Sequence, residues 1–344
     1  MVKRICIRLW LVLGAVVWIS CGSSDSVKAA KVKVGLVVDV PGIEDQTFNG
    51  AAWNGMQTAI SRLGVSGSYL VAGQPDDYGK LIETFIKAST DLIITVGFNM
   101  GDATAAKAGV HPENKFAIVD LAYDPPLSNV LGLTFATDQA AFLAGYLAAG
   151  ITRTGKVGTF GGMQIPPVTL FMDGFALGVK QYNQRHQTNV QTIGWDPITQ
   201  TGLFTGDFVN VDGGRAMGRK LIDLGVDIIL PVAGAVGPGA AEVVLESRRV
   251  YIIGVDLDWN LVFPEYAEIV LTSVLKDIDV AVFRAIVQVT DGTFAGGTYL
   301  GTLANNGVDL APFHYLDSLV PSDLKLELDV VRAGIIAETI KTRP

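Results

Sequence analysis

The chain has 344 residues, of which 49% are hydrophobic and 17% are charged, and 39 of them are glycine. This composition excludes an intrinsically disordered protein, and the length exceeds what one hydrophobic core usually supports, so we expect two domains. The formal net charge is −8. Because binding to nucleic-acid phosphates needs a basic surface, nucleic acid is excluded as an expected partner.

The N-terminus predicts a secretory signal peptide over residues 1–20, in which basic residues precede the apolar run 9–19. That run is too short to cross a bilayer comfortably. It ends beside Cys21, whose Ser-Cys-Gly context resembles a bacterial lipobox, so we expect lipidation of this cysteine after cleavage; the alternative is an uncleaved anchor with an incidental cysteine. Residues 21–31 would then form a lipid-anchored linker. Cys6 would leave with the signal, and the mature body would have no cysteine for a disulfide or zinc site.

From residue 32 the chain alternates between strand-like and helix-like segments. Residues 32–40 form an apolar, β-branched run, and residues 46–63 follow with helical spacing. Amphipathic stretches such as 77–88 lie between the later strand-like runs. Those runs are 69–72, 91–96, 116–121 and 130–135. The alternation predicts a first lobe built on a parallel sheet.

A second series begins with a helix-like segment at 138–149. Its other expected helices are 168–184, 214–224 and 240–247, and its expected strands are 156–160, 190–195, 227–232, 250–256 and 269–275. Two such series predict two doubly wound, parallel-sheet α/β lobes joined by a hinge. A helix at 279–291 and a strand at 299–303 follow, so we expect the chain to recross the hinge there. The predicted N-terminal lobe is 32–137 plus 275–298, and the predicted C-terminal lobe is 138–274 plus 299–344.

Polar and aromatic residues follow the first strand, where ligands of doubly wound sheets usually bind. Asp39 offers hydrogen-bond acceptors, Phe48 a flat apolar face, and Asn49 an amide that both donates and accepts. A ligand with a planar ring and polar edges would use all three. Phe48 could instead be a core aromatic on the first turn of its helix.

Asp120 and Asp256 occupy equivalent places in the two lobes, directly after a buried strand, where a charge needs a partner. Lys276 follows the last strand of the second series and could neutralise them while donating to a ligand oxygen. The alternative is a structural ion pair across the hinge.

Two further features precede helices of the second lobe. Gly234 opens a glycine-rich loop whose backbone could approach a ligand, but no Gly-Lys-Ser or Gly-Lys-Thr follows, so this is not a P-loop. Phe204 and Phe208 lie in the loop before residue 214, and either could supply a second aromatic face or cap a core edge.

No catalytic constellation is visible in the sequence. The three histidines, His111, His186 and His314, are scattered, and we expect solvated or core-edge positions for them. There is no G-x-S-x-G elbow. We therefore expect neither enzymatic activity nor a cofactor or metal.

Several segments resemble one family, the basic membrane protein group of substrate-binding lipoproteins, which includes bacterial purine nucleoside receptors. The resemblance covers nearly the whole body of the chain. Its segments are the D-x-x-G-x-x-D-x-x-F-N pattern at 39–49, FLAGYLA at 142–148, GKVG at 155–158, GGMQIPPV at 161–168, residues 171–178, GVD at 254–256 and LTSVLK at 271–276.

This resemblance implies a type I periplasmic binding protein fold and an extracytoplasmic lipoprotein that passes a purine nucleoside to ABC permease subunits. Phe48 and a second-lobe aromatic, Phe208 in preference to Phe204, would sandwich the purine ring. The residues meeting its polar edges would be Asp39, Asn49 and Asp120. The residues holding ribose hydroxyls would be Asp256 and Lys276.

Three other interpretations remain. Trp259 stands where relatives often carry glutamine, so the ligand could be another small polar solute. A nucleoside-processing enzyme would turn its ligand over. A ligand-responsive transcription regulator shares the bilobed fold, but a secretion signal stands before residue 32 in place of a helix-turn-helix.

Overall fold

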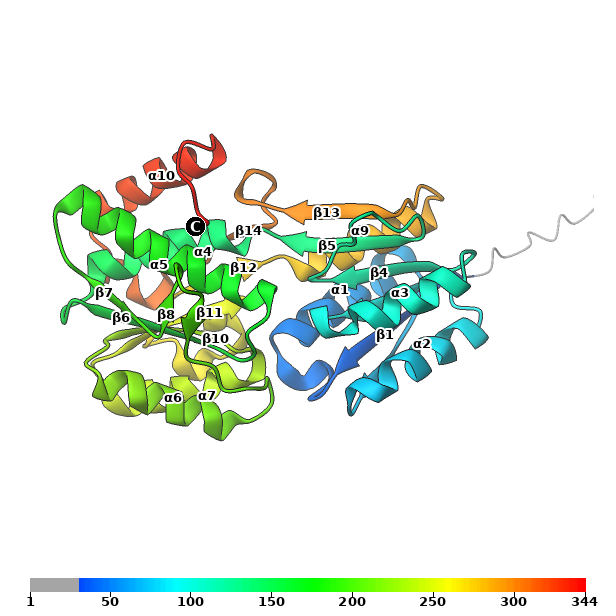
Figure 1. Cartoon of the computed structure of the whole chain (residues 1–344), viewed down its shortest axis with the longest axis horizontal. Coiled ribbons are helices and arrows are strands. Elements are labelled where there is room, and N and C mark those ends of the chain that lie inside the picture. Colours follow the sequence, from blue (N-terminus) through cyan, green and yellow to red (C-terminus); the bar gives the residue numbers. More distant parts are fainter. Residues whose placement is uncertain (1–30) are drawn as a thin grey trace, which may run out of the picture. The chain divides into compact units, whose positions relative to one another are not determined.

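The computed structural model describes residues 31–344, whose strands form two six-stranded sheets and one two-stranded ribbon (Figure 1). The predicted signal peptide and the predicted lipidation of Cys21 lie outside the described residues. Within residues 31–344, no helix has both the length and the hydrophobicity needed to cross a membrane.

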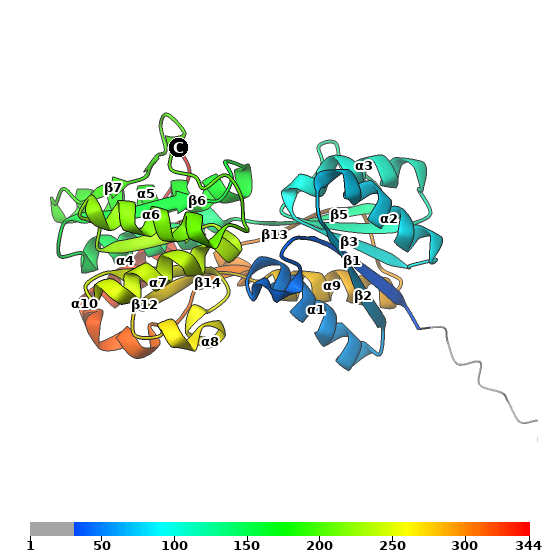
Figure 2. The same ribbon diagram turned by 90° about the horizontal axis from the view of Figure 1, so that it is seen from below.

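The first sheet is parallel throughout, with strand order β13-β5-β4-β3-β1-β2. Its strands are β1 (Lys33–Asp39), β2 (Ser66–Ala72), β3 (Leu92–Val96), β4 (Lys115–Val119), β5 (Val130–Phe135) and β13 (Gly297–Gly301). Its helices are α1 (Phe48–Leu63), α2 (Tyr78–Lys87), α3 (Gly101–Val110) and α9 (Ile278–Thr290). Figure 2 shows α2 and α3 on one face of this sheet and α1 and α9 on the other. Because both faces are covered, β3 is apolar apart from one threonine and wholly buried.

The second sheet has strand order β14-β12-β11-β10-β6-β7, and only its edge strand β14 is antiparallel. Its strands are β6 (Lys156–Gly161), β7 (Gln191–Ile193), β10 (Ile228–Val232), β11 (Tyr251–Asp256), β12 (Val270–Lys276) and β14 (Val308–Leu310), beside a small ribbon of β8 (Trp195–Asp196) and β9 (Thr201–Gly202). Its helices are α4 (Thr137–Ile151), α5 (Pro166–His186), α6 (Val211–Asp223), α7 (Gly237–Ser247), α8 (Trp259–Val262) and α10 (Ser322–Ile336). In Figure 1, α4 and α5 lie on the opposite side of this sheet from α6 and α7.

The predicted fold class, two doubly wound parallel-sheet lobes, is confirmed, but three local predictions were wrong. The strand expected at 190–195 is divided into β7 and β8 at Gly194, which has φ 95°. The prediction missed α10 and β14. The assignment of 299–344 to the C-terminal lobe fails for β13, which pairs with β5 of the first sheet. This placement follows from α9, which packs against α1 and is linked to β13 by only a short loop.

Helices α4 and α5 approach so closely that glycine is required at their contact. A Cβ at Gly178 would lie 2.0 Å from the backbone oxygen of Phe142. By contrast, Gly109 in α3 faces open space.

We predict that alanine has opposite effects at these two helical glycines. Gly178→Ala should lower the free energy of unfolding by about 1–3 kcal/mol, because overpacking outweighs the gain in helix propensity. Gly109→Ala should raise it by roughly 0.5–1 kcal/mol, since only propensity changes. Urea unfolding followed by circular dichroism measures both, and equal signs would contradict the close helix contact.

Candidate functional site

A cavity of about 340 Å³ lies where carboxyl ends of strands from both sheets meet. Strands β1, β3 and β4 of the first sheet and β10, β11 and β12 of the second end at or beside its wall. In sheets with this strand order, such ends are the usual ligand position. The predicted ligand residues that line this cavity are Asp39, Phe48, Asn49, Asp120, Phe208, Gly234, Asp256 and Lys276.

On the first-sheet side, hydrogen bonds from the start of α1 to Asp45, in the loop after β1, position two of the predicted residues. The carboxylate of Asp45 accepts hydrogen bonds from the backbone N–H groups of Thr47, Asn49 and Gly50, at 3.0, 2.9 and 2.7 Å. This fixes the N-terminus of α1, so that Phe48 and Asn49 reach the cavity on its first turn. Phe48 therefore both packs against the core and faces the cavity.

Asp39 is held by two hydrogen bonds. Its backbone oxygen accepts from Asn49 Nδ2 at 3.0 Å, and its carboxylate oxygen Oδ2 accepts from the Tyr78 hydroxyl at 2.9 Å. Burial raises the pKa of the Asp39 carboxyl, and the Tyr78 hydrogen bond opposes this rise.

Asp120, directly after β4, and Asp256, the last residue of β11, have the same unusual backbone conformation. Their φ angles are 70° and 68°, in the left-handed region that costs most residues free energy but that aspartate tolerates. In both cases the turn brings the carboxyl to the cavity wall.

Lys276 is the cation of the cavity and is only 2% exposed. Its Nζ lies 2.6 Å from Oδ2 of Asp120 and 4.8 Å from the centre of the Phe48 ring. The alternative of an ion pair between residues of the two sheets is therefore realised in the structure. Because the same pair lines the cavity, it does not exclude a role toward a ligand.

The carboxyl of Asp256 has no such partner. Within residues 31–344, no group donates a hydrogen bond to it, although the residue is only 6% exposed. Burial raises its pKa to about 6, against the opposing effect of Lys276. A buried carboxylate without a donor, on a cavity wall, is suited to accept hydrogen bonds from a ligand.

The structure separates the two candidate aromatics of the second lobe. Phe208 lines the cavity and packs on Gly162 and Gly234, where φ is 51°. Phe204 packs on Gly161 and meets Trp195 edge to face at 5.8 Å, away from the cavity wall. Trp259, at the position where relatives often carry glutamine, is fully buried against Gly254 and does not line the cavity.

Sequence reasoning missed several cavity residues. They are Tyr78, Phe98, Asn99, Met163, Ile165 and Phe171 among others. Phe98 and Asn99 come one residue after the end of β3, so the strand-end rule could have found them. Tyr78 stands at the start of α2, and its closeness to Asp39 arises only from tertiary packing.

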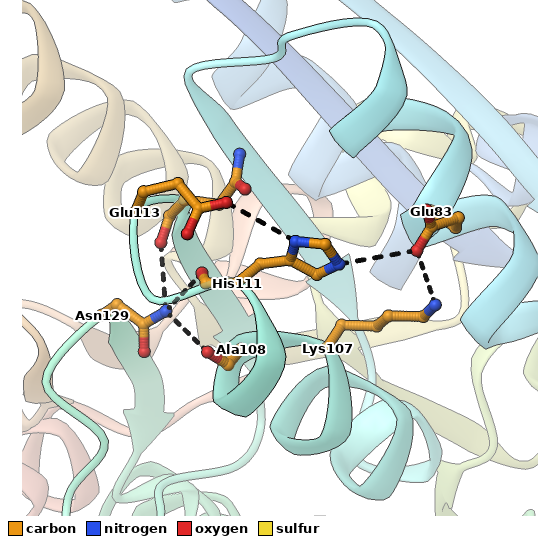
Figure 3. Close-up of polar contacts among 7 residues, drawn as sticks. Glu83, Lys107, Ala108, His111, Glu113 and Asn129 are labelled. Atoms are coloured by element: carbon orange, nitrogen blue, oxygen red, sulfur yellow. Dashed lines mark hydrogen bonds and ion pairs between the residues drawn. The ribbon is translucent and has the colours of Figure 1, made fainter.

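The three histidines lie outside this cavity, each beside a carboxylate. Figure 3 shows His111 between Glu83 and Glu113, with ring nitrogens 3.7 and 3.5 Å from their oxygens. Lys107 also donates to Glu83 at 2.7 Å, and this bond lowers the pKa of that carboxyl. Asn129 donates to carbonyl groups at the end of α3, so the cluster joins α2 and α3 to the chain before β5. Within residues 31–344, no group of three or more His, Cys, Asp or Glu residues could hold a metal ion.

The cavity therefore combines aromatic faces from two lobes with carboxylates and one ammonium group. Together with two doubly wound lobes, this arrangement is typical of solute-binding proteins. The family model for PnrA-like ABC transporter substrate-binding proteins matches residues 31–311. The chain thus belongs to this family, the basic membrane protein group, and the resemblance stated from its motifs is confirmed.

Individual relatives support the same assignment along nearly the whole chain. Basic membrane protein A of Borreliella burgdorferi is 31% identical over 339 residues, covering 97% of this chain and 94% of the relative. The ABC transporter nucleoside-binding protein BmpA of Lactococcus lactis is 29% identical over 332 residues, covering 91% of each chain. Among solved structures, a solute-binding protein of an ABC transporter system from Aeropyrum pernix has a TM-score of 0.82 at 26% identity, covering 90% of this chain and 92% of that one. This protein is accordingly an ABC transporter substrate-binding protein.

Proposed function

We propose that this protein is an extracytoplasmic, lipid-anchored receptor that captures a purine nucleoside and delivers it to the permease of an ABC importer. The observation that carries the proposal is the joint placement of Phe48 and Phe208, from different lobes, in one cavity with Asp39, Asp256 and Lys276. Two aromatic faces suit a flat base, because stacking on aromatic side chains is favourable for every base. The acceptors suit ribose hydroxyls and the polar edge of the base.

The charge of the cavity favours a neutral nucleoside over a nucleotide. Its charged side chains are those of Asp39, Asp45, Asp120, Asp207, Asp256 and Lys276. Among the described residues that line the cavity, Lys276 is the only cation, and it is already paired with Asp120, so a ligand phosphate would meet mainly negative charge.

A thermal-shift screen tests this proposal. Purine nucleosides should raise the melting temperature of the full protein, while the matching nucleotides, sugars and amino acids should not, because only a ligand that binds the folded state stabilises it. A shift with another class alone would favour the second candidate, a receptor for a different small polar solute. Chromatography of nucleosides incubated with the protein should show no product, and product accumulation would point to an enzyme.

We predict that Phe208→Ala weakens nucleoside binding while a change at Phe204 does not. Loss of one stacking face should raise the Kd by about 5- to 150-fold, from roughly 1–3 kcal/mol per stacked base. Phe204→Leu is the matched control, because it alters the same loop but only a core contact. Isothermal titration calorimetry measures both, and equal losses would contradict the assignment of the stacking ring.

A further inference from the structure

Tyr78 lines the cavity, and its hydroxyl is hydrogen-bonded to another residue of the cavity, Asp39. It is 5% exposed and donates to Oδ2 of Asp39 at 2.9 Å. Burial, followed by the nearby Asp39 carboxylate, raises the pKa of this hydroxyl above its usual value, so the phenol keeps its proton and remains a donor. A donor held against a carboxylate favours the ionised form of that carboxylate.

Asn49 is also hydrogen-bonded to Asp39, through its side-chain amide. Its Nδ2 donates to the backbone oxygen of Asp39 at 3.0 Å, and because a carbonyl oxygen can only accept, this bond fixes which end of the Asn49 amide points there. Within residues 31–344, no group donates to Oδ1 of Asp39 or to Oδ1 of Asn49. The wall beside Phe48 thus has two oxygen acceptors without donors.

We propose that Tyr78 is a specificity-determining residue, which keeps Asp39 as a pure acceptor and so selects purine nucleosides whose ring edge donates an N–H. This inference rests on the proposed nucleoside-binding function. Guanosine and inosine carry a proton on ring nitrogen N1, whereas N1 of adenosine is an acceptor whose lone pair would face a carboxylate. The protein should therefore prefer 6-oxopurine nucleosides over adenosine.

The charges around Asp39 support the acceptor role. The other titratable or charged groups of the same cavity are Tyr78, Asp45, Asp120, Asp207, Asp256 and Lys276. Lys276 is paired with Asp120, and Tyr78 is the group that donates to the Asp39 carboxylate. Without the Tyr78 hydroxyl, burial would act on Asp39 unopposed and raise its pKa further.

The test compares guanosine, inosine and adenosine by calorimetry between pH 5 and 8 in three variants. In Tyr78→Phe, guanosine affinity should fall about tenfold and the guanosine-to-adenosine preference should shrink, since a hydrogen bond to a charged group is lost. Guanosine binding by this variant should also weaken at a higher pH than in the wild type, as Asp39 takes up a proton. Asp39→Asn, which offers amide donors, should shift the preference toward adenosine.

Tyr123→Phe is the matched control, because Tyr123 donates to the backbone oxygen of Gly101 in the same lobe and does not line the cavity. It should change neither the affinities nor the preference. A preference and pH profile unchanged in both Tyr78→Phe and Asp39→Asn, with nucleosides still bound, would overturn this inference alone. Failure of the wild type to bind any nucleoside would instead overturn the proposed function, and this inference with it.

Discussion

Replacing Lys276 with methionine should both destabilise the protein and abolish nucleoside binding. Lys276 is 2% exposed and its ammonium nitrogen lies 2.6 Å from a carboxylate oxygen of Asp120, so removal of the ammonium group leaves a buried carboxylate without its partner. Breaking a buried ion pair on one side typically costs about 3–5 kcal/mol, because the remaining charge stays desolvated. Lys276 also contacts the rings of Phe48, Phe135 and Phe171, and these cation–π contacts would be lost.

A second variant separates the two effects of Lys276. In Lys276→Met combined with Asp120→Asn, no unpaired charge remains at this pair, and much of the lost free energy of unfolding should return. Nucleoside binding should not return, because the cation and one acceptor are both missing. Urea unfolding and calorimetry measure the two quantities. If the free energy of unfolding of Lys276→Met alone lies within about 1 kcal/mol of the wild-type value, the ion pair with Asp120 contributes little to stability.

The strand-end residues were predictable because a parallel sheet fixes where its strands end. Asp39, Asp120 and Asp256 each follow an apolar run, and wherever such runs pair in parallel their ends meet at one edge. The hydrogen bonds to Asp45 then fix the positions of Phe48 and Asn49, and these bonds join residues that are close in sequence. These parts of the candidate site depend on short stretches of chain.

The remaining parts depend on packing between distant segments, which periodicity does not encode. Phe204 packs on Gly161 and Trp195, whereas Phe208 packs on Gly162 and Gly234, and this tertiary packing decides which ring reaches the cavity. Tyr78 reaches Asp39 because α2 packs beside β1, a contact 39 residues apart in sequence. Strand β13 pairs with β5 because α9 packs against α1 and leads into β13 by a short loop, and the alternating pattern of a strand does not specify which sheet it joins.

Asp256→Asn should stabilise the ligand-free protein at neutral pH while weakening nucleoside binding. Burial raises the pKa of Asp256 from 3.8 to about 6. Between these values the folded protein binds more protons than the unfolded chain, so this group makes stability fall as pH rises from about 4 to about 6. Asparagine does not ionise, and the stability advantage of the variant should therefore grow by about 3 kcal/mol over this window and then stay constant.

The difference in free energy of unfolding between Asp256→Asn and the wild type reports on Asp256 alone. Burial also raises the pKa of Asp277 to about 6, but this contribution is common to both proteins and cancels. Ionisation of Asp256 lowers stability but should strengthen nucleoside binding. The affinity of the wild type should therefore fall as pH drops through about 6, since a protonated carboxyl is a weaker acceptor for ligand hydroxyls. The variant should bind more weakly at pH 8 and lose this step in its pH profile. Urea unfolding and calorimetry at matched pH values measure both. If Asp256→Asn gains stability but keeps its nucleoside affinity, Asp256 is not part of the binding site. If it gains stability and loses affinity, as we expect, the fold tolerates an unfavourable buried charge at this strand end because the ligand requires it.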